Sequence, residues 1–449
     1  MLASACLALA IGWISHSGPV TTNQLSNVLA LPASDMEQAL LRLESSGVIL
    51  RGKFSSVHPV ESASAATEWC ERRLLARIHR LTLGQLRKEI QPVTPAQFMN
   101  WLLSWQHVAP GSQLLGDRGT LEAIRQMQGF EAPANSWEQQ ILRRRIADYE
   151  PKVLDHLCLT GSVGWGRLSP HPATLDSITD GRRRVIPTCV APITFFARED
   201  SEWMIPRREA SDAEPQGLSL DAAAVLRFLR QRGASFFPDI VRGTGKLKSE
   251  VETALWELVA AGLLTADGFD NLRALIDPKR RAGRGGGRTT RPRHSAGRWS
   301  LLYSGDAHDR TRALEATCWM LLHRYGIVFR ELLTRETILP KWRELLITLR
   351  RLEDRGEIRG GRFVSGFLGE QFALPVAVES LRAKRKQGPS GEITTIAAAD
   401  PLNLVGIVIP GERVPANSGK VVSFRDGVAV GPDERVLRGP NILPMPRAR

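Results

Sequence analysis

One pattern occurs four times in this chain, Leu-x-x-Leu-x-x-x-Gly followed by a short apolar run. Leucines three residues apart lie on one face of a helix, and a glycine in the left-handed conformation ends a helix. The repetition therefore predicts four copies of one structural module. The residues that define the copies are Leu40, Leu43 and Gly47; Leu154, Leu157 and Gly161; Leu255, Leu258 and Gly262; and Leu349, Leu352 and Gly356.

The third copy shows the predicted module most clearly. Residues 222–232 and 237–242 predict two helices, and Ser249 with Glu252 predicts the capped start of a third. Asp267-Gly268 is typical of a two-residue hairpin turn. Three helices closed by a hairpin form a winged helix, whose third helix can enter the DNA major groove while the wing contacts the backbone. A packing or dimerisation module is the alternative for any single copy.

Charge favours the DNA-binding alternative. The 449 residues carry a formal net charge of +13 and a pI near 10.0, and such an excess attracts polyanions. No apolar run reaches the ~18 residues of a membrane span, and residues 1–13 are interpreted as the first helix of a module rather than a signal peptide. We predict a cytoplasmic, nucleoid-associated protein with DNA, single-stranded or duplex, as its partner and no membrane partner.

The fold class expected from these patterns is mainly α with short β wings, with tandem winged-helix modules followed by a small all-β, barrel-like C-terminal segment. Strands are expected at residues 191–197, 393–396, 404–409 and 421–424. The predicted segments are a winged helix at 1–61, a helical region with the second winged-helix signature at 67–170, an irregular or β connection at 171–217, a winged helix at 218–276, an Arg/Gly-rich linker at 277–299, a winged helix at 300–376, and a β-rich segment at 390–449.

Candidate nucleic-acid-binding residues are basic side chains on predicted wings, on the third helix of the fourth module and in the Arg/Gly-rich linker. Such linkers bind nucleic acid by counterion release without sequence preference, and a plain tether is the alternative. The candidates are Arg51, Lys53, Arg280, Arg281, Arg284, Arg288, Arg291, Arg293, Arg343, Arg350, Arg351, Arg359 and Arg362.

Motifs for chemistry are not found. The segment at residues 243–247 lacks the hydroxyl residue that a phosphate-binding loop needs for magnesium, so we expect no ATP hydrolysis by this chain alone and no cofactor in it. The five cysteines form no Cys-x-x-Cys pair, and His156 with Cys158 has no second ligand pair nearby, so no metal site is predicted.

The order of segments resembles the C-terminal region of the Lhr (large helicase-related) family of bacterial ATP-dependent DNA helicases, which are linked to DNA repair. The resemblance covers nearly the whole chain. The residues that carry it are 68–80, 92–93, 105–111, 126–131, 159–168, 233–237, 266–278, 360–374 and 399–406.

This resemblance implies DNA binding by tandem winged helices that end in a β-barrel, with self-assembly into a homo-oligomer and a helicase motor polypeptide as further partners. ATP and Mg belong to the family's motor domains, which this sequence lacks, so we expect a truncated or split gene product or an extension that acts separately. Residues 431–449 are Pro- and Arg-rich where the family pattern implies more barrel strand.

A second function follows from the same resemblance. The family's arrangement is also similar to that of DNA glycosylases with a Gln-x-Gln motif, to which only Gln126 and Gln128 correspond here. The alternative is therefore a glycosylase-like base-excision activity on damaged DNA. No other catalytic residue is predicted.

Overall fold

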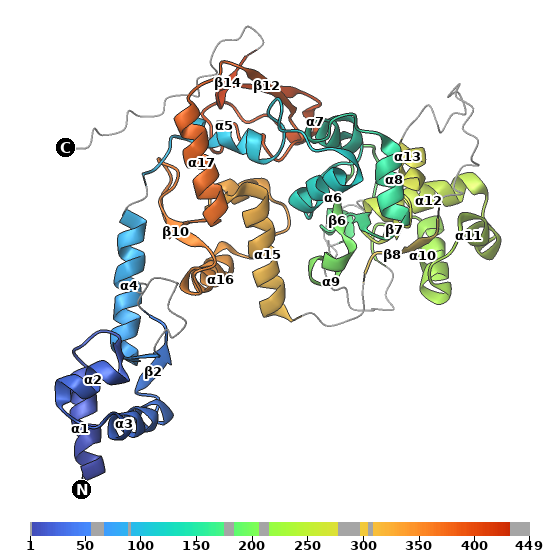
Figure 1. The fold of residues 1–449 in the computed structure, drawn as a ribbon. Helices are drawn as coiled ribbons and strands as arrows, with labels where there is room; N and C mark the ends of the chain where they lie inside the picture. Colours follow the sequence, from blue (N-terminus) through green and yellow to red (C-terminus); the bar gives the residue numbers. More distant parts are fainter. Residues whose placement is uncertain are drawn as a thin grey trace. The chain divides into compact units, whose positions relative to one another are not determined.

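The computed structural model describes residues 2–54, 67–88, 91–174, 184–205, 215–276, 297–303 and 309–431. Contacts within the chain divide it into two compact units, Met1–Gln91 and Pro92–Arg449 (Figure 1). Each unit is described by itself.

The first unit is a winged helix. Its elements are α1 (Leu2–Ile14), β1 (Val20–Thr21), α2 (Thr22–Leu29), α3 (Ala33–Ser45), β2 (Ile49–Gly52), β3 (Glu68–Glu71) and α4 (Arg72–Lys88). The strands form an antiparallel sheet in the order β1-β3-β2, and Met36, Leu40 and Trp69 lie in the core beneath it. Because β3 completes this sheet, the first unit continues past the predicted boundary at residue 61.

The second unit begins with the module that carries the second signature. Its elements are α5 (Pro95–Trp105), α6 (Gly116–Met127), β4 (Ala132–Pro133), the π-helix η1 (Trp137–Leu142), α7 (Arg143–Arg145), α8 (Pro151–Leu159), β5 (Val163–Gly166), η2 (Pro172–Thr174), β6 (Pro192–Ala197), η3 (Arg198–Asp200) and α9 (Ser201–Met204). The strand expected at residues 191–197 is confirmed as β6, which lies between β4 and β5. Every residue of β5 is buried, so this wing belongs to the core.

The third module differs from its prediction at both ends of its third helix. Its elements are α10 (Leu220–Arg232), α11 (Phe237–Thr244), α12 (Lys248–Ala260), β7 (Leu264–Ala266), α13 (Asp270–Ile276) and β8 (Trp299–Leu301). Helix α12 begins before Ser249, and Glu250, not Glu252, accepts a hydrogen bond from the backbone N–H of Leu247 at 2.9 Å. The capping box predicted at Ser249 is therefore wrong.

The predicted hairpin around Asp267-Gly268 is also wrong. The chain enters α13 directly after this turn, and β7 pairs antiparallel with β8 instead. Trp299 of β8 is fully buried in the module's core, and the Asp267 carboxylate accepts a hydrogen bond from the backbone N–H of Arg298 at 3.0 Å. The partner strand was missed because it follows the Arg/Gly-rich segment, far along the chain.

The fourth module has the expected helices and wing. Its elements are α15 (Arg310–Tyr325), β9 (Ile327–Val328), η4 (Leu332–Arg335), α16 (Trp342–Asp354), β10 (Arg359–Gly361), β11 (Gln371–Ala373) and α17 (Pro375–Gln387). The sheet order is β10-β11-β9, all antiparallel, and Leu345, Leu349 and Leu352 of α16 are buried.

The chain continues into β12 (Ile393–Ala397), η5 (Ala416–Ser418), β13 (Val421–Arg425) and β14 (Val428–Val430). The strands expected at 393–396 and 421–424 are confirmed, whereas residues 404–409 form a tight loop with one bridge between Val405 and Ile409. The described part of this segment is a three-stranded antiparallel sheet in the order β12-β13-β14 and closes no barrel. The mainly α fold with short β wings is confirmed, and the barrel-like closure is not.

Two fully buried arginines are paired with carboxylates inside the second unit. Arg145 is fully buried and donates to both carboxylate oxygens of Asp400, at 2.7 and 2.8 Å. Arg324, also fully buried, pairs with Glu336, which accepts a hydrogen bond from the Tyr325 hydroxyl at 2.7 Å. Burial and the neighbouring Glu336 carboxylate raise the pKa of Tyr325, so the hydroxyl keeps its proton and can donate it.

Two further properties concern the described residues alone. Every helix among them is too short or too polar to cross a lipid bilayer. Nowhere in the described ranges do three or more His, Cys, Asp or Glu side chains gather as a metal site would require.

Candidate nucleic-acid interface

Helix α16 of the fourth module presents one apolar and one basic face. Pro340 lies just before the helix, which starts at Trp342. Leu345, Leu349 and Leu352 recur at helical spacing and are buried, which forces the residues between them outward. Exposed residues on the opposite face are Arg343, Ile347, Arg350, Arg351 and Asp354.

The arginines on this face differ in their ion pairing. Arg350 donates to Glu370 in the wing loop just before β11, with Nε 2.8 Å from Oε2. Among the described residues, no acidic side chain pairs with Arg343 or Arg351. Both residues are exposed, so their guanidinium groups can exchange water for phosphate oxygens.

The wing beside α16 adds two more exposed arginines. Strands β10 and β11 pair with Arg359 opposite Ala373, and Figure 1 shows β10 next to α16. Arg359 and Arg362 are exposed, and the described residues supply neither with an acidic partner. A helix face with a basic wing beside it is the geometry by which winged helices contact DNA.

The loop of this wing is firmly held. Gln371 is fully buried, and its Oε1 accepts hydrogen bonds from the backbone N–H groups of Phe363 at 2.9 Å and Val364 at 2.8 Å. The Val93 backbone donates to the carbonyl of Phe363 at 2.8 Å. The Phe367 ring packs on Phe329 with centroids 4.7 Å apart. The wing is therefore a rigid projection.

The first unit offers a weaker basic surface. Arg51 lies on β2, where its Nε is 3.2 Å from Glu44 and its guanidinium lies over the Trp69 ring at 5.8 Å. Lys53 is exposed just beyond β2. Helix α3 of this unit carries Asp35, Glu37 and Glu44, so its outer face is acidic in comparison with α16. The structure thus leaves Lys53 better placed for phosphate contact than Arg51.

The predicted candidates in the Arg/Gly-rich linker lie outside the described residues. They are Arg280, Arg281, Arg284, Arg288, Arg291 and Arg293.

Both glutamines of the glycosylase-like prediction are buried in the junction between modules. The Nε2 of Gln126 donates to the carbonyl of Trp105 at 2.9 Å, while its Oε1 has no partner. The amide of Gln128 is used at both ends: Nε2 donates to Asp200 at 2.9 Å, and Oε1 accepts from the N–H of Ala197 at 3.1 Å. These contacts give both residues a packing role.

The backbone of residues 126–128 also contacts the fourth module. Arg324 of α15 donates to the carbonyl oxygen of Gln126 at 3.3 Å and to that of Gln128. The nearby Glu131 is buried, and its carboxylate accepts from the N–H groups of Leu168 and Ser169, at 2.7 and 2.8 Å. The Gln126–Glu131 segment therefore joins the second and fourth modules.

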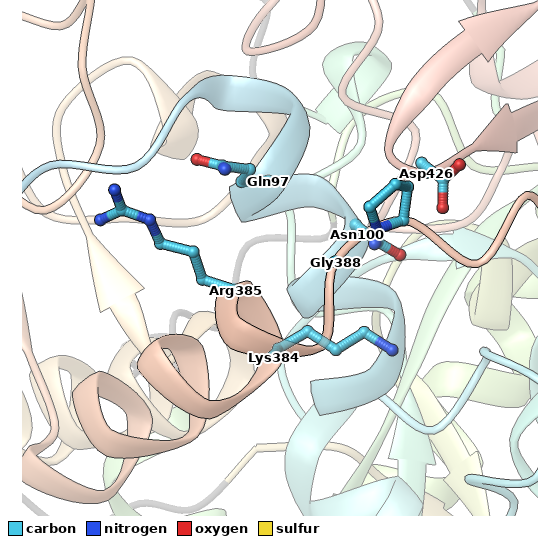
Figure 2. A pocket seen from close by; sticks show the side chains of 7 residues that line it. Gln97, Asn100, Lys384, Arg385, Gly388 and Asp426 are labelled. Atoms are coloured by element: carbon cyan, nitrogen blue, oxygen red, sulfur yellow. The ribbon is translucent and has the colours of Figure 1, made fainter.

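A small pocket lies between α5, α17 and the β13–β14 turn (Figure 2). Its volume is about 240 Å³, and it is lined by Gln97, Asn100, Lys384, Arg385, Gly388, Pro389 and Asp426. Figure 2 shows the side chains of Lys384 and Arg385 pointing in different directions, and Asp426 is used to accept from the N–H groups of Ser390 and Gly391. The pocket is smaller than the ~300 Å³ at which sites for drug-sized ligands begin, and its lining has no aromatic side chain on which a base could stack.

Three residues of interest were not predicted from the sequence. Lys384 and Arg385 lie on α17, and no local pattern in the sequence indicates that α5 lies beside them. Leu368 at the tip of the fourth wing is 82% exposed. Its signal was present in the sequence, since an apolar Phe-Leu pair stands between Gly366 and Gly369.

Comparison with known proteins supports the fourth module as a unit. Two family profiles, each described as "Large helicase-related protein, winged-helix domain", match residues 307–393 and residues 93–182. The family counts them as its fourth and third winged-helix domains, respectively. The first match contains α16 and its wing.

Two curated relatives match along most of the chain. A Mycolicibacterium smegmatis protein named "Lhr helicase/ probable uracil glycosylase" is 28% identical over 440 residues, 91% of this chain and 27% of the relative. The Escherichia coli protein named "Lhr helicase/uracil glycosylase" is 28% identical over 438 residues, 88% of this chain and 26% of the relative. The chain thus spans about a quarter of the length of these relatives.

Among solved structures, the Streptomyces sahachiroi DNA glycosylase AlkZ aligns over 76% of this chain and 88% of its own, with a TM-score of 0.41 and 14% identity.

Proposed function

Because this chain is a C-terminal winged-helix region of the large helicase-related family, we propose that it binds DNA through α16 and the β10–β11 wing of its fourth module. The observation that carries the proposal is the basic face of α16. Arg343 and Arg351 point away from the core without an acidic partner among the described residues, and Arg359 and Arg362 continue the charge onto the wing. The net charge of +13 gives the field that draws a polyanion to this face.

The binding proposed here acts mainly on phosphates. Four exposed arginines on one helix and its wing can each displace a condensed counterion, which makes affinity fall steeply with salt. Helix α16 and the hydrogen-bonded wing fix the backbone that carries the arginines, so binding costs mainly the rotamer freedom of the arginine side chains. Sequence preference is expected to be small, since arginine-to-phosphate contacts do not read bases.

The test is fluorescence anisotropy with single-stranded and duplex oligonucleotides at several salt concentrations. Substituting both arginines, R343A with R351A, is expected to weaken binding about tenfold or more, since each removes a charge-assisted phosphate contact. The matched control replaces Arg230 and Arg232, two exposed arginines on α10 of the third module, and should change affinity by less than about twofold. Equal losses in both double variants would remove α16 from the proposal, and the absence of any salt-dependent binding would remove DNA binding.

We further propose that the chain places DNA for an ATP-driven helicase motor, as a separate polypeptide or as part of one chain, and assembles with copies of itself. The relatives are named helicases and are about four times longer than their match to this chain, which supports a motor outside this sequence. Light scattering measures self-assembly, and co-purification with the motor polypeptide measures the partner. A monomeric mass would contradict self-assembly, and failure to co-purify with the motor polypeptide would contradict the partnership.

Base excision is the second candidate, because the names of both relatives include uracil glycosylase. The burial of Gln126 and Gln128 and the engagement of the Gln128 amide at both ends favour DNA binding over it. Incubation with a uracil-containing oligonucleotide tests this directly. Abasic product that is lost in Q128A, while the variant keeps its circular dichroism spectrum and its DNA affinity, would establish excision; no product above Q128A would dismiss it.

A further inference from the structure

We propose that Leu368, at the tip of the fourth wing, inserts between stacked bases of the DNA that the basic face of α16 holds. This inference rests on the proposed function and adds a mode of contact to it. The chain would then bind distorted or mispaired duplex in preference to intact duplex.

Exposure alone does not distinguish Leu368, since single exposed leucines are ordinary on protein surfaces. Leu368 differs from such leucines because the residues beside it are held in place. The residue before it, Phe367, is anchored on Phe329, and glycines with φ of +88° and +92° stand at 366 and 369. These left-handed positions turn the chain sharply on both sides of Phe367 and Leu368. The tip therefore directs one ring inward and one leucine outward.

The body of the wing holds this arrangement in place. Gln371 binds Phe363 and Val364 through three hydrogen bonds of 2.8 to 2.9 Å, including one from its Nε2 to the carbonyl of Val364. Ser365 donates its backbone N–H to the carbonyl of Val93 at 2.9 Å. A rigid loop loses little conformational freedom when its tip enters a crowded site, so the side chain is preorganised for insertion.

The charges on this wing indicate that the partner contacted by Leu368 is DNA. Arg359 and Arg362 are exposed on the same wing, and the Arg350–Glu370 pair connects the tip to α16. If the arginines of this wing contact phosphates, an exposed apolar side chain on the same wing meets the one apolar part of DNA, the faces of the bases. Proteins that bend DNA insert Leu, Ile, Met or Phe between base steps in this way and unstack them in part.

A protein partner fits the surface less well. Protein interfaces are built on contiguous apolar patches of several hundred Å². Among the described residues of the 362–370 loop, Leu368 is the exposed large apolar side chain, while Phe363 and Val364 are buried. One exposed leucine in this loop is too small an apolar area for stable protein docking.

The experiment compares wild type, L368A, L368M and L220A on three duplexes. Leu220 is 88% exposed on α10 and serves as the matched leucine control. One duplex is intact, one carries a mismatch, and one carries a fluorescent adenine analogue whose emission rises when it unstacks. Anisotropy gives affinity and salt dependence, and emission reports insertion.

Wild type and L220A are expected to bind the mismatched duplex about tenfold more tightly than the intact one, because an unpaired step costs less to unstack. Both should raise the emission of the analogue. L368A should lose the preference and the emission rise while it keeps its salt dependence and its affinity for intact duplex within about twofold. L368M, which keeps an apolar side chain of similar volume, should retain both effects.

Two results would overturn the inference, and they are distinguishable. Binding of all duplexes with no mismatch preference and no emission rise in wild type, or with L368A equal to wild type, refutes insertion and leaves DNA binding by α16 intact. No salt-dependent binding of any duplex refutes both the insertion and the proposed function.

Discussion

Helices α12 and α16 carry the same signature and have opposite surroundings. Both are 13 residues long and are the third helix of their module. In α12, Val251, Ala254, Leu255, Trp256, Glu257, Leu258, Val259 and Ala260 are all buried, whereas α16 buries only Leu345, Thr348, Leu349, Leu352 and Glu353. The signature therefore predicts the module but not how much of its third helix is buried. Helix α12 is mostly buried, whereas α16 is exposed along one face.

The surroundings of α12 explain the difference. Helix α10 packs along it, and the buried Arg167 donates to the carbonyl of Ala260 at 2.7 Å from the second module. Gly262, with φ of +74°, lies so close to the carbonyl of Arg167 that an added Cβ would be 2.8 Å from that oxygen. These neighbours bury the C-terminal half of α12, and the part left exposed or half-buried carries Glu250 and Glu252, which disfavour contact with phosphates.

The largest expected effect tests burial directly. Trp256→Ala in α12 removes a ring that is 2% exposed and should lower the free energy of unfolding by about 3 to 5 kcal/mol. Ile347→Ala in α16, where the side chain is 44% exposed, should change it by less than about 0.5 kcal/mol. Urea denaturation followed by circular dichroism measures both values. Similar losses in the two variants would show that α16 is covered in solution.

A second effect concerns the acidic residues of the two helices. Glu257 of α12 is buried, and its Oε1 accepts from the N–H of Ser219, which caps α10, at 2.6 Å. Glu257→Ala should cost about 1 to 3 kcal/mol because this N–H loses its acceptor, whereas Glu257→Gln keeps an acceptor and should cost less. Glu344→Ala of α16 breaks only the exposed pair with Arg310 and should cost about 0 to 1 kcal/mol. An equal cost for Glu257→Ala and Glu344→Ala in the same denaturation measurement would contradict the contrast.

The smallest effect is in the salt dependence of DNA binding. Arg351→Ala alone should reduce the slope of log affinity against log salt by about 0.7 to 0.9, the amount expected for one lost phosphate contact. Arg230→Ala on α10 should leave the slope unchanged. Anisotropy titrations at four or more salt concentrations measure both slopes, and a reduced slope in Arg230→Ala would place the contact on the third module.

Local signals in the sequence predicted much of the fold. The four leucine-glycine signatures each lie on a helix and its end: α3, α8, α12 and α16. Strands β6, β12 and β13 were found because runs of apolar residues between turn residues carry their own signal. The strand expected at residues 404–409 was wrong, since its apolar side chains are buried by a turn rather than by a sheet.

Pairing over long distances was not predictable in the same way. The partner of β7 is β8, beyond the Arg/Gly-rich segment, and β3 joins the first sheet across residues 55–66. Which strand pairs with which depends on the packing of whole helices, and no local pattern encodes it. For the candidate site, the arginines of α16 were predicted, but the ion pair that occupies Arg350 and the rigid tip that exposes Leu368 were not.

The sequence by itself determined the repeated module, the basic charge and the helices that carry it. Hydrophobic spacing and glycine positions act within a few residues, so they can be recognised along the chain. Only the tertiary structure decided how much of each copy's third helix is buried. Burial of α12, of the β5 wing and of Gln126 and Gln128 arises from modules packed on one another, and exposure of α16 arises because no described element covers it. Contact with other modules therefore separates α12, which is mostly buried, from α16, whose basic face stays exposed.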